Sequence, residues 1–218
     1  MDDQGHLNNL LKWGIENSAA SRDDSSARVN TDPPRTAGSG LSPEALAALL
    51  GGPSDADRMR DAMVAILSPE VDLENKLTAW DNFEQLIENI DNANNMEQLG
   101  MWTPLVKELD NTEAECRRMA CWCIGTAVQN NIKAQERLQA HDAIPKLVEL
   151  SIEDETQAVR KKAILALSSG IRNCQPNLDA AVKALPENEK PKSSIDAADM
   201  GAIDTIIQKL RDDSQQRG

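Results

Sequence analysis

The cysteines are the side chains whose spacing in this sequence comes closest to a site for chemistry, as nucleophiles or as metal ligands. Three of the four, Cys116, Cys121 and Cys123, lie close together in a segment with a helical pattern. On a helix, Cys116 and Cys123 share one face while Cys121 points elsewhere, and no pair has the Cys-x-x-Cys spacing of zinc and redox sites. We therefore predict packed, reduced thiols and no metal site.

The other residues that could act in catalysis lack suitable neighbours. His6 and His141 are the two histidines, and neither has a candidate nucleophile beside it. The glycines at 38–40 and 51–52 lack the strand, helix and lysine of a phosphate-binding loop. The acidic stretch "ENIDNANN" at 88–95 lacks the spaced carboxylates of a calcium loop, so we expect a solvated loop between repeats there. The sequence thus predicts a protein that is not an enzyme and binds no cofactor.

The composition of the chain limits which partners it can bind and which cell compartment suits it. A formal net charge of −13 repels nucleic acid and anionic membrane surfaces. No apolar stretch approaches the roughly 20 residues that cross a bilayer, and the N-terminus lacks the basic flank and cleavage site of a signal peptide. With reduced thiols as well, we predict a cytoplasmic protein that binds neither nucleic acid nor membranes. Tyrosine is absent and phenylalanine occurs once, so the core must be largely aliphatic, which suits packed helices.

Internal repetition is the feature that predicts the fold. The segment "GMWTPLVKEL" at 100–109 matches "DAIPKLVEL" at 142–150, at an offset of about 41 residues. Three longer helical segments repeat at nearly the same offset, at 75–90, 115–131 and 158–174. A period of about 40 to 47 residues made only of helices is typical of armadillo or HEAT solenoids. We predict an all-α, armadillo-like helical-repeat solenoid of about three repeats with a disordered N-terminal segment.

The segments that flank the repeats differ from them in composition. Residues 18–40 are rich in Ser, Asp, Pro and Gly and bury too little to repay their ordering entropy. The stretch "GAIDTIIQKL" at 201–210 looks like the short helix of one further unit whose long helix is missing. The predicted organisation is an apolar tip at 1–17, a disordered linker at 18–40, N-terminal capping helices at 41–67, armadillo repeats at 68–185, and an excursion with a C-terminal capping helix at 186–218.

Two details of the helix ends follow from local pattern. The second capping helix is expected to begin at Ser54 or Asp55 and end before Pro69. Its apolar face is predicted to comprise Met59, Met63, Ile66 and Leu67. The long helices end at Asn89, Asn130 and Asn173, where asparagine tolerates the left-handed backbone conformation of a C-terminal cap.

A solenoid offers a concave surface lined by its long helices. If Ala120 and Ile124 face the core, then Trp122 and Thr126 lie on another face, toward the groove. Trp122 stands out because tryptophan is enriched among interface anchors. The same spacing in the three units gives a mixed polar groove of Asp81, Gln85, Glu88, Trp122, Thr126, Gln129, Leu165, Ser169 and Arg172.

Several motifs, in order along nearly the whole chain, resemble a known family. The segments "LGGPSDADRM" at 50–59, "LIENIDNANN" at 86–95 and "IGTAVQNN" at 124–131 are similar to the short fungal members of the armadillo-type nucleotide exchange factors of the seventy-kilodalton heat-shock protein. The resemblance implies that the groove binds the chaperone's nucleotide-binding domain, displaces one lobe and speeds ADP release, after which ATP ejects the client. Carried over by position, it implies chaperone contacts at Asp81, Gln85, Glu88, Asp91, Asn92, Ala93, Asn94, Asn95, Trp122, Thr126, Gln129, Asn130, Ser169 and Arg172.

The chain departs from the family pattern at several aromatic positions. Leu50, Leu165 and Cys174 stand where relatives commonly carry an aromatic residue. We expect the fold to tolerate these changes, because leucine is an acceptable core substitute. Longer relatives have four repeats, so contacts made by a fourth repeat are not expected here.

An armadillo cargo adaptor that binds extended basic peptides is the alternative function. Such adaptors hold the peptide backbone with an asparagine four residues after a groove tryptophan. Here Thr126 follows Trp122 at that spacing, and the equivalent pairs, Asp81 with Gln85 and Leu165 with Ser169, contain neither residue. The exchange factor is therefore favoured, although the negative charge also suits basic ligands.

The apolar tip raises a separate question. Its large side chains are Leu7, Leu10, Leu11, Trp13 and Ile15, and a helix this short that contains a glycine is marginal alone in water. One interpretation is that the tip docks back onto the solenoid. The other is that it resembles the extended segments that this chaperone binds as clients, and that its tether keeps it at high effective concentration near the client cleft. We predict that it blocks client rebinding, and that the protein is a monomer.

Overall fold

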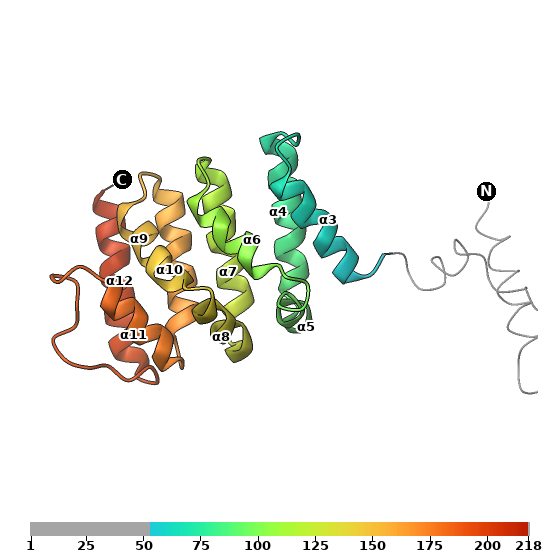
Figure 1. Ribbon diagram of the computed structural model, residues 1–218. Helices are drawn as coiled ribbons and strands as arrows, with labels where there is room; N and C mark the ends of the chain where they lie inside the picture. Colours follow the sequence, from blue (N-terminus) through green and yellow to red (C-terminus); the bar gives the residue numbers. More distant parts are fainter. Residues whose placement is uncertain (1–52, 218) are drawn as a thin grey trace, which may run out of the picture. The chain divides into compact units, whose positions relative to one another are not determined.

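The computed structural model describes residues 53–217, and all regular structure within this range is helical. The helices form a row of packed units that follows the order of the chain, from α3 to α12 (Figure 1). The apolar tip, the linker and the helix predicted near 42–50 lie outside the described residues. For residues 53–217, the predicted all-α, armadillo-like repeat fold is confirmed.

Helix α3 (Asp55–Leu67) begins and ends where the sequence predicted. The Ser54 hydroxyl accepts a hydrogen bond from the Asp57 backbone N–H at 3.2 Å, which satisfies one of the free donors of the first turn. The buried stripe consists of Met59, Ala62, Met63 and Ile66. The prediction for Leu67 was wrong, because this side chain lies beside the stripe at the last turn and is 45% exposed.

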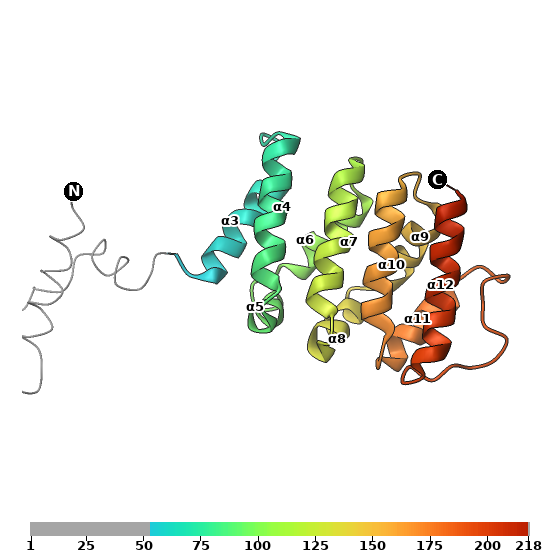
Figure 2. The same ribbon diagram turned by 180° about the vertical axis from the view of Figure 1, so that it is seen from behind.

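Three helices of 15 residues each form one layer of the row: α4 (Leu73–Ile87), α7 (Ala114–Val128) and α10 (Gln157–Ile171). They stand side by side and face the viewer in Figure 2. Ala79, Ala120 and Ala163 are all buried at equivalent positions. The repeat that the sequence predicted from segments 75–90, 115–131 and 158–174 is therefore confirmed.

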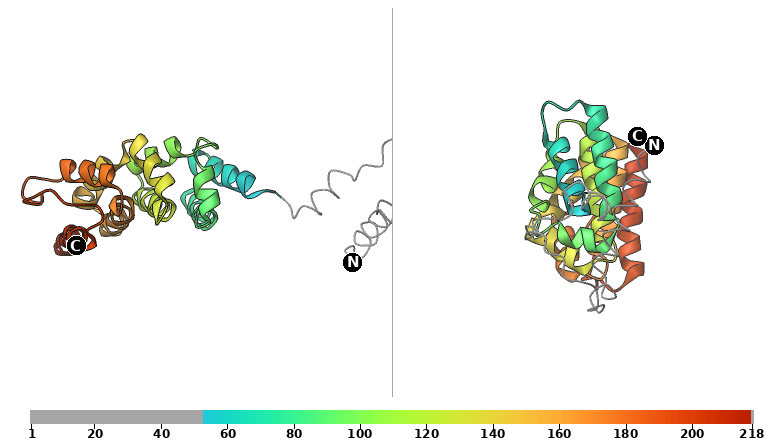
Figure 3. Two further views of the ribbon diagram at one scale, coloured as in Figure 1. Left: turned by 90° about the horizontal axis from the view of Figure 1, so that it is seen from below. Right: turned by 90° about the vertical axis from the view of Figure 1, so that its right-hand side faces the viewer.

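The shorter helices form a second layer, which Figure 3 shows from below as a separate row. They are α5 (Ile90–Asn95), α6 (Trp102–Lys107) with a 3₁₀ turn at Glu108–Asp110, α8 (Ile132–Ala140), α9 (Ala143–Glu153) and α11 (Gln175–Ala184). Two complete units, α5–α7 and α8–α10, therefore contain three helices each.

The loop predicted at 88–95 was wrong, since most of it is helix α5. The Asn89 side chain accepts a hydrogen bond from the Asp91 backbone N–H at 2.9 Å and so caps this helix. Burial of Ala93, which is 2% exposed, anchors it to the core. Asn89 accordingly has a φ of −73° and not the left-handed conformation that we expected. Asn130 and Asn173, with φ of 52° and 56°, confirm that expectation at the other two helix ends.

Helix α12 (Met200–Gln216) differs from the short repeat helix that the sequence predicted for 201–210. It has 17 residues and continues the line of long helices in Figure 2. It runs antiparallel to α10, because Asp204 pairs with Arg172 at the end of α10 while Ser214 contacts Arg160 near its start. It is therefore not equivalent to any repeat helix, and it covers the flank of α10.

Two equivalent arginines fasten successive units together. The Arg117 guanidinium donates to the Asn111 and Thr112 carbonyls and pairs with Asp154 of the next unit at 2.7 Å. Arg160, which is 2% exposed, donates in the same way to the Asp154 and Glu155 carbonyls. At this last junction Ser214 of α12 takes the place of the acidic partner, and its carbonyl accepts from Arg160 at 2.9 Å. Because a buried guanidinium needs every donor satisfied, this contact fixes α12 on the stack.

Candidate functional site

The layer of long helices contains a hollow of about 440 Å³, which we call the groove cavity. Residues of α4, α7 and α10 and of the segments that follow α4 and α7 line it: Glu84, Glu88, Trp122, Gly125, Thr126, Gln129, Asn130, Leu165 and Ser169. Six of the residues expected to contact the chaperone therefore come together here, namely Glu88, Trp122, Thr126, Gln129, Asn130 and Ser169. The helical spacing within each unit and the repeat between units together explain this grouping.

Gly125 determines how closely α7 and α10 approach at the floor of the cavity. A Cβ atom on this residue would lie 3.3 Å from the Ala166 Cα and 3.4 Å from its backbone nitrogen. These contacts are with backbone, which cannot rotate away as a flexible side chain would. The small residue thus permits the close helix packing on which the groove depends.

Other expected contact residues lie apart from the groove cavity. Gln85 lines a second hollow of about 670 Å³ between α3 and α4. Asp81 is exposed on α4. Arg172 is occupied within the fold, because its guanidinium pairs with Asp204 and donates to the Ser168 hydroxyl at 3.2 Å. Arg172 therefore holds α12 as well as lying near the end of the groove.

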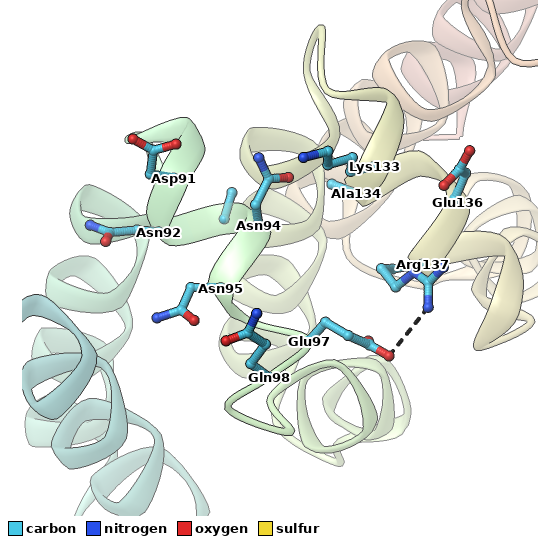
Figure 4. Close-up of a pocket in the computed structure, with 11 residues that line it drawn as sticks. Asp91, Asn92, Asn94, Asn95, Glu97, Gln98, Lys133, Ala134, Glu136 and Arg137 are labelled. Atoms are coloured by element: carbon cyan, nitrogen blue, oxygen red, sulfur yellow. Dashed lines mark hydrogen bonds and ion pairs between the residues drawn. The ribbon is translucent and has the colours of Figure 1, made fainter.

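The expected contacts at 91–95 line a different hollow, of about 680 Å³, between α5 and α8. Figure 4 shows Asp91, Asn92, Asn94 and Asn95 on one side of this hollow and Lys133, Glu136 and Arg137 on the other, with Arg137 paired to Glu97 at 3.3 Å. Asn92 donates to the Leu86 carbonyl at 2.9 Å, and Ala93 is buried, so both hold α5 in place. Asp91, Asn94 and Asn95 remain available along this edge of the row.

Trp122 is partly buried and one face of its ring is covered. The Lys162 ammonium lies 3.5 Å from the centroid of the ring, a cation–π contact between adjacent long helices. Burial lowers the pKa of Lys162, and the nearby Arg118 adds to this effect. Sequence reasoning missed Lys162, since it is separated from Trp122 by nearly one repeat and nothing local links the two.

Glu84 was also missed, although it lies at the base of the groove cavity. Glu84 is 6% exposed, and its Oε1 accepts a hydrogen bond from the Thr126 hydroxyl at 2.7 Å. A charged residue in the sequence of an amphipathic helix is ordinarily predicted to lie on the solvent-exposed face. The burial of Glu84 could have been predicted from Thr126, because the hydroxyl of this residue faces the same groove from the next repeat.

The four cysteines are buried and unpaired with one another, as the sequence predicted. Burial raises the pKa of Cys121 and of Cys123 well above that of a free thiol. Since the thiolate is the reactive form, these side chains serve packing and not chemistry. Within residues 53–217, no group of three His, Cys, Asp or Glu side chains is placed to hold a metal ion.

The raised thiol pKa predicts a pH dependence of stability. Above about pH 8.5 the unfolded state releases the Cys123 proton while the folded state retains it, so rising pH favours unfolding. From pH 8 to 9.5 the Cys123 thiol should therefore lower the free energy of unfolding by about 1 kcal/mol. Urea unfolding of the wild type and of Cys123→Ala at both values measures this loss as a difference between their pH slopes. Parallel slopes would contradict the prediction.

His141 follows the end of α8 and stacks on Trp102, with 6.4 Å between the ring centroids, which is a packing role. No helix in the described part of the chain combines the length and the apolar character needed to cross a membrane.

Comparison with known proteins places the chain in a family. The family model "Nucleotide exchange factor Fes1" matches residues 7–96, and the "SIL1/FES1/HPBP1 C-terminal domain" matches residues 92–179. The Hsp70 nucleotide exchange factor FES1 of Gibberella zeae is 50% identical, over 94% of this chain and 95% of the relative. That of Coccidioides immitis is 51% identical, over 95% and 97%.

More distant comparisons agree with this assignment. The Hsp70 nucleotide exchange factor FES1 of Saccharomyces cerevisiae is 42% identical over 77% of this chain, which spans 56% of that longer relative. The crystal structure of an engineered protein has a TM-score of 0.52 at 18% identity, covering 80% of this chain and 72% of the other, which supports the fold alone. The resemblance found in the motifs is thus confirmed, and the chain belongs to the Fes1 family of nucleotide exchange factors.

Proposed function

We propose that this protein is a nucleotide exchange factor that binds the nucleotide-binding domain of an Hsp70 chaperone through the groove cavity and accelerates ADP release. The observation that carries the proposal is the similarity, at 50% and 51% identity over nearly the whole chain, to proteins named Hsp70 nucleotide exchange factor. The proposed contact surface is the groove cavity together with Asp81, Gln85, Asp91, Asn94 and Asn95.

The mechanism involves binding and no covalent chemistry. A partner shifts a conformational equilibrium only by its difference in affinity for the two states. The groove must therefore fit the nucleotide-free chaperone better than the ADP-bound form. Close packing at Gly125 and the arginine contacts between units make the row of helices a stiff template for that purpose.

The tip has a second part in this proposal. Leu7, Leu10, Leu11, Trp13 and Ile15 form an apolar segment that the linker tethers to the repeats. It is proposed to occupy the client-binding cleft after nucleotide exchange, so that a released client does not rebind. The Fes1 family model begins at residue 7, which supports a family role for this segment.

The compartment and assembly complete the proposal. The buried, unpaired cysteines suit the reducing cytoplasm. The protein is proposed to act as a monomer, because α12 already covers the flank of α10 where another unit would stack. The cargo adaptor is not favoured, since the Thr126 hydroxyl at the would-be asparagine position is bonded to Glu84.

Thermodynamic reciprocity tests the binding mechanism. The protein should bind the isolated nucleotide-binding domain at least tenfold more tightly without nucleotide than with saturating ADP, a difference of about 1.4 kcal/mol. The affinity of that domain for ADP must then fall by the same factor when the protein is saturating. Both constants are accessible by calorimetry. Equal affinity for the two states would rule out the mechanism.

A further inference from the structure

The groove cavity contains a carboxylate that the fold buries without a cation. Glu84 is 6% exposed, and within residues 53–217 its side-chain partner is the Thr126 hydroxyl, which donates to Oε1. Between residues 53 and 217, no Lys, Arg or His forms an ion pair with Glu84. Burying a carboxylate costs free energy unless a partner compensates it. Among residues 53–217, the carboxylate at the base of the groove therefore has a neutral hydrogen-bond partner and no ion pair.

The surroundings of Glu84 favour a cation from outside. The side chains that line the cavity include two carboxylates, Glu84 and Glu88, and none of the lining residues is basic. Lys162 interacts with Glu84 through its charge, but it forms no ion pair with it, because its ammonium lies over the Trp122 ring, 3.5 Å from the ring centroid. Within residues 53–217, no basic side chain comes within ion-pair distance of Glu84, so the opening presents carboxylate oxygens that can still pair with a cation.

The size and lining of the cavity fit one long side chain. A volume of about 440 Å³ holds such a side chain with several waters. Leu165, which is 41% exposed, and the edge of Trp122 offer apolar surface for an aliphatic stem. Glu84, Glu88 and the Gln129 amide offer acceptors at more than one angle, which suits the planar fork of a guanidinium better than the single ammonium of lysine.

We propose that the groove cavity receives one arginine side chain of the bound chaperone, with its guanidinium paired to Glu84. This inference rests on the proposed function, because it names the chemistry by which the same surface recognises its partner. Pairing on binding would remove the cost of the buried carboxylate, so that a group unfavourable to the free protein becomes favourable in the complex.

The substitution Glu84→Gln separates this role from a structural one. The amide keeps the size of the side chain and an oxygen that accepts from Thr126, but it carries no charge. We expect affinity for the nucleotide-free domain to fall about tenfold. The melting temperature of the free protein should stay level or rise, because an unpaired buried charge is removed. A merely structural glutamate would instead show a lower melting temperature with unchanged binding.

Glu149→Gln is the matched control. It removes the same charge from an exposed position on α9, where Glu149 pairs with Lys146, outside the groove cavity. We expect its affinity to stay within twofold of the wild type. An equal loss in both variants would mean that only net charge matters and would overturn the inference, as would wild-type affinity in Glu84→Gln.

A double-mutant cycle identifies the partner side chain. Arginines on the surface of the nucleotide-binding domain are replaced one at a time by glutamine, and each variant is titrated with the wild type and with Glu84→Gln. One arginine should make the tenfold effect of Glu84→Gln shrink to less than twofold. Coupling to a lysine alone, or to no basic residue, contradicts the inference. Acceleration of ADP release by the wild type is recorded in the same series, and its absence would instead refute the proposed function.

Discussion

Replacing Ser169 by arginine should reduce the acceleration of ADP release by about 30-fold or more at subsaturating protein. Ser169 lines the groove cavity from α10 and is partly exposed. Its side chain makes no hydrogen bond within the described residues, so the change breaks nothing there. The new side chain would occupy much of the opening of this cavity and bring its own cation to Glu84 and Glu88. Blocking the centre of an interface typically costs about 2 kcal/mol, which corresponds to this factor.

The control is Ser194→Arg. Ser194 is exposed in the excursion before α12 and lies outside the groove cavity. It adds the same charge and volume, and we expect exchange within twofold of the wild type. Thermal unfolding of both variants excludes loss of fold as the cause. If Ser169→Arg retained its activity within threefold, the binding surface would lie elsewhere, for instance along the α5–α8 edge.

Replacing the five large apolar residues of the tip by serine should leave ADP release within twofold but keep clients bound. A tethered segment acts at an effective concentration of about millimolar, far above that of a client at micromolar concentration. Without it, the apparent affinity of the chaperone for a client in the presence of ATP and this protein should rise at least tenfold. Displacement of a fluorescent client peptide measures the effect, with the full chain retained so that the length of the tether does not change.

A polar variant of the same segment provides the comparison. Substitution of Asn8, Asn9 and Asn17 by serine changes the tip without removing its apolar side chains. We expect client displacement as in the wild type. Should the apolar variant displace clients equally well, the tip has no role in client release. Should it instead slow ADP release tenfold, the tip would belong to the exchange surface itself.

Periodicity predicted the parts of the fold that each repeat specifies for itself. Ala79, Ala120 and Ala163 recur at about 41 residues, and the helical spacing from Ala120 placed Trp122 and Thr126 in the groove. The grouping of Glu88, Asn130 and Ser169 with them follows from the same two periods. Local pattern suffices here because the three long helices run in parallel with matching contacts.

The parts that were missed depend on tertiary contact. Helix α5 has only six residues, too few to be stable alone, and burial of Ala93 with capping by Asn89 maintains it. Helix α12 resembles a repeat helix in sequence but runs antiparallel, because Arg160 and Arg172 bind it from α10. Neither the pattern of α12 nor that of α5 reveals these contacts.

The charged residues of the groove show the same limit. Glu84 has the sequence pattern of a solvated residue, and its burial becomes visible only beside Thr126 of the next repeat. Arg172, by contrast, was expected to be available to a partner and is engaged by Asp204. In a solenoid, the neighbouring repeat determines whether a charge on a long helix is free, buried or paired.

Release of a fluorescent ADP analogue from an Hsp70 chaperone is the most direct test of the central claim. The chaperone is preloaded with the analogue and mixed in a stopped-flow instrument with excess unlabelled ATP and increasing amounts of the full-length protein. We expect the release rate to rise with protein concentration and then saturate, as the nucleotide-free complex becomes the dominant state. A rate that stays unchanged at micromolar protein would contradict the proposed function.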